Sequence, residues 1–190
     1  KPINTKSIQK ITIKDKRFFF YIVKGLSQNK PYDVMRGEET QIAGFIYENP
    51  NFNGIICLPG THSKWVRFKK GKILNFTTFM TGELFSLITE HSILKYSIYN
   101  KNINDKVFSS SLKESMSQSY SLLSSLFKIR AKNLLVKKFS NHARSTILGF
   151  LLGMELSTIQ KIIGKKYVVI IGSPINAFLY EKALSSLKIK

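Results

Sequence analysis

Apolar and polar positions change their spacing several times along the first quarter of the chain. Residues 10–24 contain two β-rich runs on either side of a polar turn at Lys14–Arg17, and these runs predict a pair of strands. The polar stretch PYDVMRGEET, which begins at Pro31, reads as a loop. Apolar side chains then recur at helical spacing over ETQIAGFIYEN, which predicts a short helix after the loop.

The middle of the chain has the pattern of strands and turns. The apolar run GIICLPG predicts a strand, and THSKWVRF and KILNFTTF, joined by a KKGK turn, predict a hairpin. Thr81 stands directly before the apolar periodicity of GELFSLITEHSILK. We therefore expect Thr81 to be the N-cap of a helix over that segment.

Helical spacing dominates the second half of the chain. Residues 107–135 predict one or two amphipathic helices, and HARSTILGFLLGMELSTIQKII predicts a buried helix that ends at Gly164. The last unit is a strand, YVVIIG, a turn, SPIN, and a helix, AFLYEKALSSLK. Continuous β-branched strands are typical of sheets covered on both faces, so the predicted class is α/β.

Composition excludes several classes of protein. Of 190 residues, 43% are hydrophobic, which is enough to bury a core despite a formal net charge of +19. The single cysteine, Cys57, excludes an internal disulfide, and no Cys/His cluster has zinc spacing. The apolar runs are shorter than the ~20 residues that a membrane span requires. We expect a soluble, cytoplasmic protein that neither binds a structural metal nor contacts a membrane.

The basic charge has two interpretations. Lysines outnumber arginines by 25 to 5 and are spread over the whole chain, which is typical of a solvated surface. A nucleic-acid-binding surface is the alternative, because basic side chains neutralise phosphates. Proteins that recognise bases rely mainly on arginine, so we favour the solvated surface.

Three segments could carry chemistry, and each has a simpler interpretation. In MRGEETQ, acidic residues at a helix start are either capping charges or a general base. LPGTHSKW is either an ordinary hairpin turn or a turn that binds anions through backbone N–H groups. In this segment His62 is interpreted as a turn or core residue, Trp65 as packing, and Lys64 as solvated. VVIIGSPIN ends a strand at Gly172, where α/β folds often bind ligands.

The segment FTTFMTGE adds Thr78, Thr81 and Glu83, for which helix capping is a sufficient explanation. The sequence lacks the P-loop, dinucleotide-binding, α/β-hydrolase and zincin motifs. These motifs therefore assign no function.

Taken in order, the segments DVMRGEETQIAGF, LPGTHSKWV, FTTFMTGELF and HSIL resemble the 2-dehydro-3-deoxygalactonokinase family from about Ile22 to the end of the chain. The resemblance implies a ribonuclease-H-like fold of the actin, sugar-kinase and Hsp70 ATPase superfamily, with two lobes around a cleft. Residues 1–30 would be the tail of the N-terminal lobe, and residues 31–190 a truncated C-terminal nucleotide-binding lobe. The phosphate motif that opens such kinases, Asp-Trp-Gly-Ser/Thr, is absent, so we expect a fragment that is inactive by itself.

The resemblance also implies roles for individual residues. Glu38 matches the general base of related carbohydrate kinases, with Glu39 as the fallback and Arg36 beside the carboxylate of the sugar acid or the transferred phosphoryl group. Asp33, Arg36 and Glu39 would lie near the sugar acid. The expected nucleotide-binding residues are Gly60, Thr61, His62, Ser63, Gly172 and Ser173.

The implied reaction is transfer of the γ-phosphoryl group of ATP, with Mg²⁺, to the 6-hydroxyl of 2-dehydro-3-deoxy-D-galactonate. A kinase for another keto-deoxy sugar acid and a basic nucleic-acid-binding module are the alternatives. The expected partners are the sugar acid and ATP, with a homo-oligomer as a further possibility.

Overall fold

The computed structural model describes residues 8–100, 102–117, 121–136, 142–164 and 167–187, and its architecture is mixed α/β. A four-stranded sheet has the order β7 (Lys72–Phe79), β6 (Ser63–Lys69), β5 (Gly54–Leu58) and β8 (Val168–Ile170). The β5–β6 and β6–β7 pairs are antiparallel, whereas β5 and β8 are parallel. The hairpin and the final strand predicted from the sequence are confirmed.

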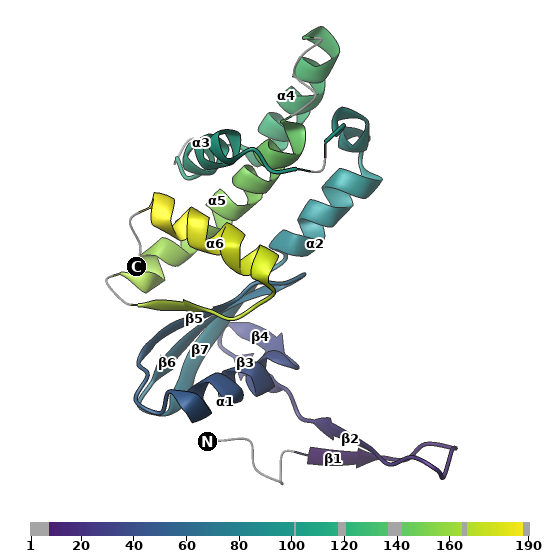
Figure 1. The fold of residues 1–190 in the computed structure, drawn as a ribbon, viewed down its shortest axis with the longest axis vertical. Coiled ribbons are helices and arrows are strands. Elements are labelled where there is room, and N and C mark those ends of the chain that lie inside the picture. The colour runs from purple at the N-terminus through teal and green to yellow at the C-terminus, as the bar shows by residue number, and fades with distance from the viewer. Residues whose placement is uncertain (1–7, 101, 118–120, 137–141, 165–166, 188–190) are drawn as a thin grey trace.

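Alternating side chains of β5 pack into two different cores. Ile55 and Cys57 face a cluster formed with α3 (Asp105–Ser115), α5 (Ala143–Ile163) and α6 (Pro174–Ser186). Ile56 and Leu58 face a second cluster that includes Ile42 of α1 (Glu38–Glu48). The central strands are therefore covered on both faces, α5 and α6 lying on one side and α1 on the other (Figure 1).

Helices away from the sheet form a third cluster. α2 (Thr81–Ser86) continues through a π-helical turn, η2 (Leu87–His91), and a 3-10 turn, η3 (Ile93–Ser97), and the cluster also includes α4 (Leu122–Leu135). Because the helix over residues 81–97 changes its pitch, its apolar side chains do not share one buried face. Leu94 is buried, but Leu84 and Leu87 are exposed.

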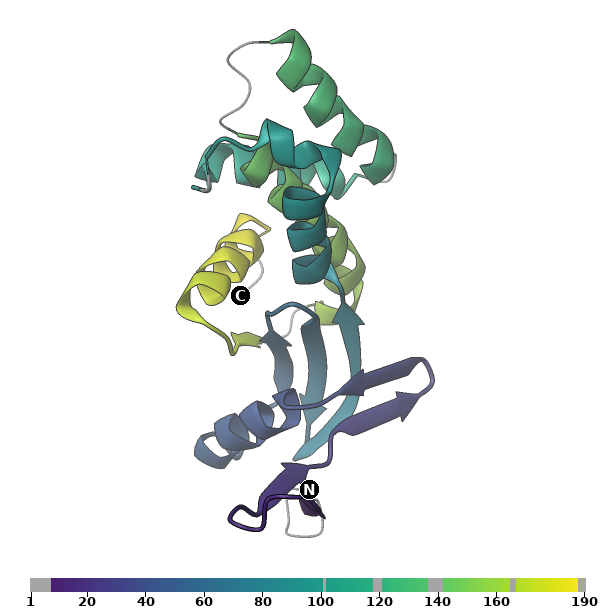
Figure 2. The same ribbon diagram turned by 90° about the vertical axis from the view of Figure 1, so that its right-hand side faces the viewer.

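Two hairpins precede the sheet in the chain. β1 (Ile8–Ile11) pairs with β2 (Phe20–Val23), as the sequence predicted, and this hairpin projects away from the sheet in Figure 1 and lies below it in the view of Figure 2. β3 (Leu26–Asn29) pairs with β4 (Tyr32–Met35). The expectation of a loop from Pro31 was therefore wrong for residues 32–35, because pairing with β3 overrides the polar character of that stretch.

Side chains of the β3–β4 hairpin make hydrogen bonds with backbone groups of the edge strand β7. The Gln28 amide accepts a hydrogen bond from the Phe76 N–H (3.0 Å) and donates one to the Phe76 carbonyl (3.2 Å). The Asp33 carboxylate accepts from the Thr78 N–H (2.8 Å) and the Thr78 hydroxyl (2.6 Å). An edge strand with free N–H groups invites pairing with other chains, so these contacts protect it.

α5 is the only helix in the described ranges that is long and apolar enough to cross a membrane. Its apolar run is shorter than a membrane span, but the helix extends over 21 residues. More than half of its most apolar stretch is buried, and it contributes residues to two of the three core clusters. These contacts identify α5 as a core helix of the fold.

Close packing of α3 on α5 depends on Gly153. A Cβ atom at this position would lie 2.0 Å from the Ser115 hydroxyl and 2.4 Å from the Leu112 carbonyl oxygen. By contrast, Gly44 in the interior of α1 is exposed and has no atom within 4 Å of an added Cβ. The two glycines therefore allow the same substitution to be compared with and without a steric clash.

We expect Gly153→Ala to lower the free energy of unfolding by about 1–3 kcal/mol, because α3 must shift to make room. Gly44→Ala should raise it by about 0.5–1 kcal/mol, because alanine loses less backbone entropy in a helix. Urea denaturation of the three proteins measures both changes. Equal effects of the two substitutions would contradict this account of the α3–α5 contact.

Candidate functional site

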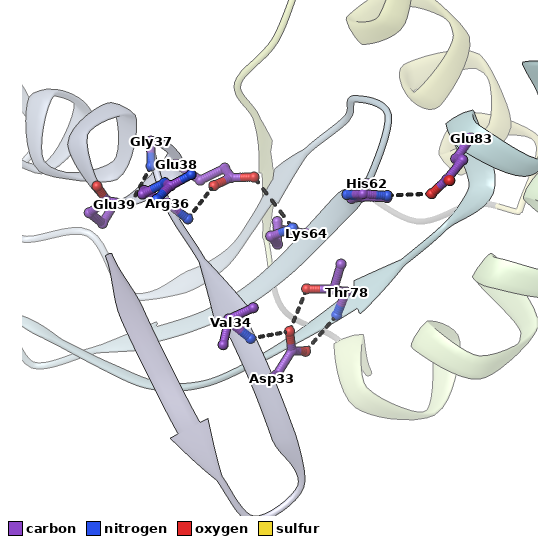
Figure 3. Close-up of polar contacts among 10 residues, drawn as sticks. All are labelled: Asp33, Val34, Arg36, Gly37, Glu38, Glu39, His62, Lys64, Thr78 and Glu83. Atoms are coloured by element: carbon purple, nitrogen blue, oxygen red, sulfur yellow. Dashed lines mark hydrogen bonds and ion pairs between the residues drawn. The ribbon is translucent and has the colours of Figure 1, made fainter. Parts of the chain in front are cut away.

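The start of α1 places two glutamates in different environments (Figure 3). Glu38 Oε2 accepts a hydrogen bond from the Arg36 N–H (3.0 Å), and its Oε1 lies 3.4 Å from Lys64 Nζ on β6. Glu39 turns back onto its own helix start, where Oε2 accepts from the Gly37 N–H (2.7 Å). Glu38 thus extends toward the sheet, whereas Glu39 is buried in a local turn.

Lys64 is buried, so its assignment to the solvated surface was wrong. Its side chain is 5% exposed, and Glu38 is its ion-pair partner among the described residues. A lysine ammonium that leaves water needs a compensating charge, which the Glu38 carboxylate supplies. The KKGK turn of the same hairpin is exposed, as expected.

The turn between β5 and β6, residues 59–62, is held against the start of α2. The Glu83 N–H donates to the Thr61 carbonyl (2.9 Å), and a Cβ atom at Gly82 would lie 2.3 Å from the Gly60 carbonyl oxygen. His62 Nε2 lies 2.6 Å from Glu83 Oε2, with both side chains partly exposed. His62 is therefore a residue of an accessible turn and is not part of the core.

The connection from β8 to α6 lies beside this turn. The Ile171 N–H donates to the Cys57 carbonyl (2.8 Å), and a Cβ atom at Gly172 would lie 3.3 Å from Cδ of Pro59. Ser173 caps α6 by accepting from the Asn176 N–H (3.4 Å). Two of the predicted nucleotide-binding segments, 60–63 and 172–173, are thus brought together at the edge of the sheet where the parallel strands β5 and β8 end.

Beneath this edge lies a buried carboxylate that the sequence analysis did not identify. Glu155 of α5 is 2% exposed and accepts hydrogen bonds from Trp65 Nε1 (2.6 Å), the Tyr180 hydroxyl (3.1 Å) and the Thr81 hydroxyl. Its signal in the sequence is a lone acid within the apolar stretch LLGMELS. An acidic residue in such a stretch is rarely buried without partners, so it could have been recognised.

Burial raises the pKa of Glu155 above its ordinary value of 4.5, while the hydrogen bonds from Thr81, Trp65 and Tyr180 act in the opposite direction. The Ser63 hydroxyl also lies close enough to lower this pKa, although it makes no hydrogen bond of normal geometry. Burial likewise raises the pKa of the Cys57 thiol well above its ordinary value. Both groups therefore favour their neutral forms more than they would in water.

Helix capping does not explain the polar residues of FTTFMTGE. The N-cap of α2 is Met80, and the Thr81 hydroxyl donates to Glu155. Thr78 bonds to Asp33, and Glu83 pairs with His62. Each side chain makes a tertiary contact, and no local pattern in the sequence encodes such a contact.

The remaining predicted site residues differ in whether their side chains are exposed and free to contact a ligand. The Asp33 carboxylate is already used by Thr78 and by the Val34 N–H (2.8 Å). The Arg36 side chain is exposed, whereas the Ser63 side chain is fully buried, which leaves only its backbone near the turn. The described residues contain no group of three or more His, Cys, Asp or Glu side chains that could hold a metal ion.

The geometry suits recognition of an anion next to a carboxylate. Small residues at Gly60, Thr61 and Gly172 leave backbone groups approachable, and the N-terminus of α6 lies beside them. Glu38 and Lys64 supply a carboxylate and an ammonium from the adjoining strand and helix start. Such an arrangement can bind phosphate oxygens and accept a proton from a hydroxyl group.

Comparisons with known proteins agree on one family. Residues 1–190 match the family model described as 2-keto-3-deoxy-galactonokinase, so the match extends further toward the N-terminus than Ile22. A probable 2-dehydro-3-deoxygalactonokinase of Rhizobium meliloti (strain 1021) is 34% identical over 171 residues, which are 87% of this chain and 56% of that protein. The 2-dehydro-3-deoxygalactonokinase of Escherichia coli (strain K12) is 28% identical over 171 residues, 88% of this chain and 57% of that protein.

A solved structure shares the fold. The crystal structure of a protein from Sinorhizobium meliloti assigned as a 2-dehydro-3-deoxygalactonokinase superposes with a TM-score of 0.83 at 32% identity. It matches 95% of this chain and 60% of its own chain. This chain therefore spans somewhat more than half the length of the relatives that it matches.

The raised pKa of Glu155 predicts a specific pH dependence of stability. The pKa of Glu155 is higher in the folded state than in the unfolded state. The resulting contribution to the free energy of unfolding is therefore fully present below about pH 4.5 and is lost as the pH rises through the folded-state pKa. The difference in free energy of unfolding between wild type and Glu155→Gln should therefore shift in favour of wild type as the pH falls toward 4.5. Urea denaturation at several pH values measures this difference, and a shift in the opposite direction would contradict the assignment.

Proposed function

The chain belongs to the 2-keto-3-deoxy-galactonokinase family, and from that membership we propose that the whole protein transfers the γ-phosphoryl group of ATP to the 6-hydroxyl of 2-dehydro-3-deoxy-D-galactonate. The observation that carries the proposal is the meeting of the glycine-containing turn at 59–62, the β8–α6 connection and the Glu38–Lys64 pair at one edge of the sheet. The names of the relatives support the same activity.

The proposed fold is that of the actin, sugar-kinase and Hsp70 ATPase superfamily. In this assignment residues 1–30 end the first lobe, and residues 31–190 form most of the second. Residues 1–7 lie outside the described residues, and the proposed boundary falls in the turn between β3 and β4. The mixed sheet covered by helices on both faces is consistent with this assignment.

Glu38 is the proposed general base. Its Oε1 lies 3.4 Å from Lys64 Nζ, and this ion pair holds the side chain toward the sheet. In the reaction the sugar hydroxyl oxygen bonds to the γ-phosphorus, the bond from that phosphorus to the leaving ADP oxygen breaks, and the hydroxyl proton passes to Glu38. Glu39 is the weaker candidate because its side chain is buried and turned back onto the start of its own helix, where it accepts from the Gly37 N–H.

The nucleotide would lie against residues 60–63 and 172–173. Backbone N–H groups near Gly60 and Thr61 suit phosphate oxygens, and the N-terminus of α6 adds a favourable dipole. ATP, with Mg²⁺, would supply the phosphoryl group. The described residues contain no group of three or more His, Cys, Asp or Glu side chains, so none of them is assigned as a Mg²⁺ ligand. Phosphoryl transfer depends mainly on positioning and charge neutralisation, to which these N–H groups can contribute.

Arg36 is the proposed contact for the carboxylate of the sugar acid, because its backbone N–H donates to Glu38 and its side chain is exposed. Asp33 contributes indirectly by holding β4 against β7. Another keto-deoxy sugar acid is the alternative substrate. Comparing kcat/KM for several such acids distinguishes the two, with galactonate-derived substrate expected to give the highest value.

We expect Glu38→Gln, in a protein that spans the full length of its relatives, to lower kcat by about 10²–10⁴-fold with little change in the KM for ATP. The amide keeps the shape of the side chain but cannot take the proton. Coupled measurement of ADP release gives both constants.

The matched control is Glu48→Gln, which removes the same charge from the exposed end of α1. This variant should keep the wild-type kcat. A Glu38→Gln enzyme as active as this control would refute the assignment of the base, and a large loss in Glu39→Gln alone would transfer the role to Glu39.

A further inference from the structure

Glu155 lies under the proposed nucleotide edge and is hydrogen-bonded to three of the elements that meet there. Trp65 belongs to β6, which starts directly after the 59–62 turn, and Thr81 opens α2, which packs against that turn. Tyr180 belongs to α6, whose N-cap is Ser173. One carboxylate therefore receives hydrogen bonds from three elements that meet at the proposed nucleotide site.

The residues that follow Thr81 in the chain contact the 59–62 turn directly. Thr81 is adjacent to Gly82, where an added Cβ would lie 2.3 Å from the Gly60 carbonyl oxygen. The next residue, Glu83, donates its N–H to the Thr61 carbonyl. Moving the Thr81 hydroxyl away from Glu155 would therefore displace the 59–62 turn directly.

Packing alone does not require a glutamate at this position. Besides Thr81 and Ser63, the neighbours of Glu155 belong to an apolar and aromatic cluster, in which the rings of Trp65 and Tyr180 lie 6.3 Å apart. Replacing buried charges by apolar residues is often neutral or stabilising in protein cores, whereas hydrogen bonds define one relative placement of their partners. The geometry favours a role in specifying where the three elements lie.

We propose that Glu155 is a positioning residue that holds β6, α2 and α6 in the arrangement that forms the nucleotide edge. The nucleotide part of this inference rests on the proposed function. Glu155 itself is buried and contacts no substrate.

Amide hydrogen exchange of this chain, followed residue by residue by NMR, tests the positioning without any ligand. The reporters are the N–H groups of Glu83, bonded to Thr61, and Ile171, bonded to Cys57; the N–H of Phe108 at the start of α3 is the reference. In Glu155→Leu the donors of Trp65, Thr81 and Tyr180 lose their acceptor. We expect exchange at the two reporters to accelerate about tenfold more than at the reference.

Two further variants separate positioning from a general loss of stability. Leu151→Ala opens a cavity in the same helix but within the third cluster, so it should accelerate all three amides by the same factor. Glu155→Gln keeps an acceptor for the Trp65 N–H and should restore most of the protection. Uniform acceleration in Glu155→Leu, or unchanged exchange at the reporters, would overturn the proposal.

If Glu155→Leu does not fold, Tyr180→Phe replaces it, because this substitution removes one donor and keeps the aromatic packing on Trp65. It should accelerate exchange at Ile171 more than at Phe108. Equal exchange factors at these two amides would count against the proposal.

The kinetic counterpart uses the protein extended to the length of its relatives. Glu155→Leu should raise the KM for ATP several-fold and leave the KM for the sugar acid unchanged, whereas Leu151→Ala should change neither. Unchanged KM for ATP would overturn the nucleotide part of the inference. Absence of kinase activity in the wild-type protein would refute the proposed function, while the exchange experiment would still decide whether Glu155 positions the turn.

Discussion

A carboxylate that is 2% exposed has to be surrounded by hydrogen-bond donors, and at Glu155 these donors come from a strand and two helices. Glu155 belongs to helix α5, which packs between the sheet and the outer helices. The placement of β6, α2 and α6 around it determines where the 59–62 turn and the β8–α6 connection lie. In this account the geometry of the candidate site depends on the hydrogen bonds that Glu155 accepts.

Electrostatics at the edge of the sheet involves few of the basic residues. The formal net charge is +19, yet Lys64 is buried and faces the single carboxylate of Glu38. Most other lysines in the described part of the chain are exposed, and solvent and salt screen their charges. The location of one ammonium therefore bears more on the chemistry than the total charge does.

Much of the fold could be predicted from local patterns. The β6–β7 hairpin, helix α5 and the final strand and helix follow from apolar periodicity and from Gly164 at the end of α5. The strand β4 could not be recognised in this way, because its four residues, YDVM, lie within the otherwise polar stretch from Pro31 and form a strand through pairing with β3. Threonine is a common N-cap residue, but the Thr81 hydroxyl donates a hydrogen bond to Glu155, 74 positions away in the chain.

The candidate site was predictable only in part. Glycines and hydroxyl residues identified the turn at 59–62 and the β8–α6 connection, since those residue types are what close approach of a backbone to a phosphate requires. The partners of Lys64 and Glu155 could not be predicted, because both contacts join residues that are distant in sequence. Burial of these two ionisable side chains is a property of the tertiary structure.

Titration of this chain with ADP, followed by the NMR signals of its backbone amides, tests the location of the nucleotide site most directly. The account predicts that the largest shifts fall on Gly60, Thr61, Gly172 and Ser173. Shifts spread over the exposed lysines, with none at these four residues, would contradict it and would indicate binding by charge alone.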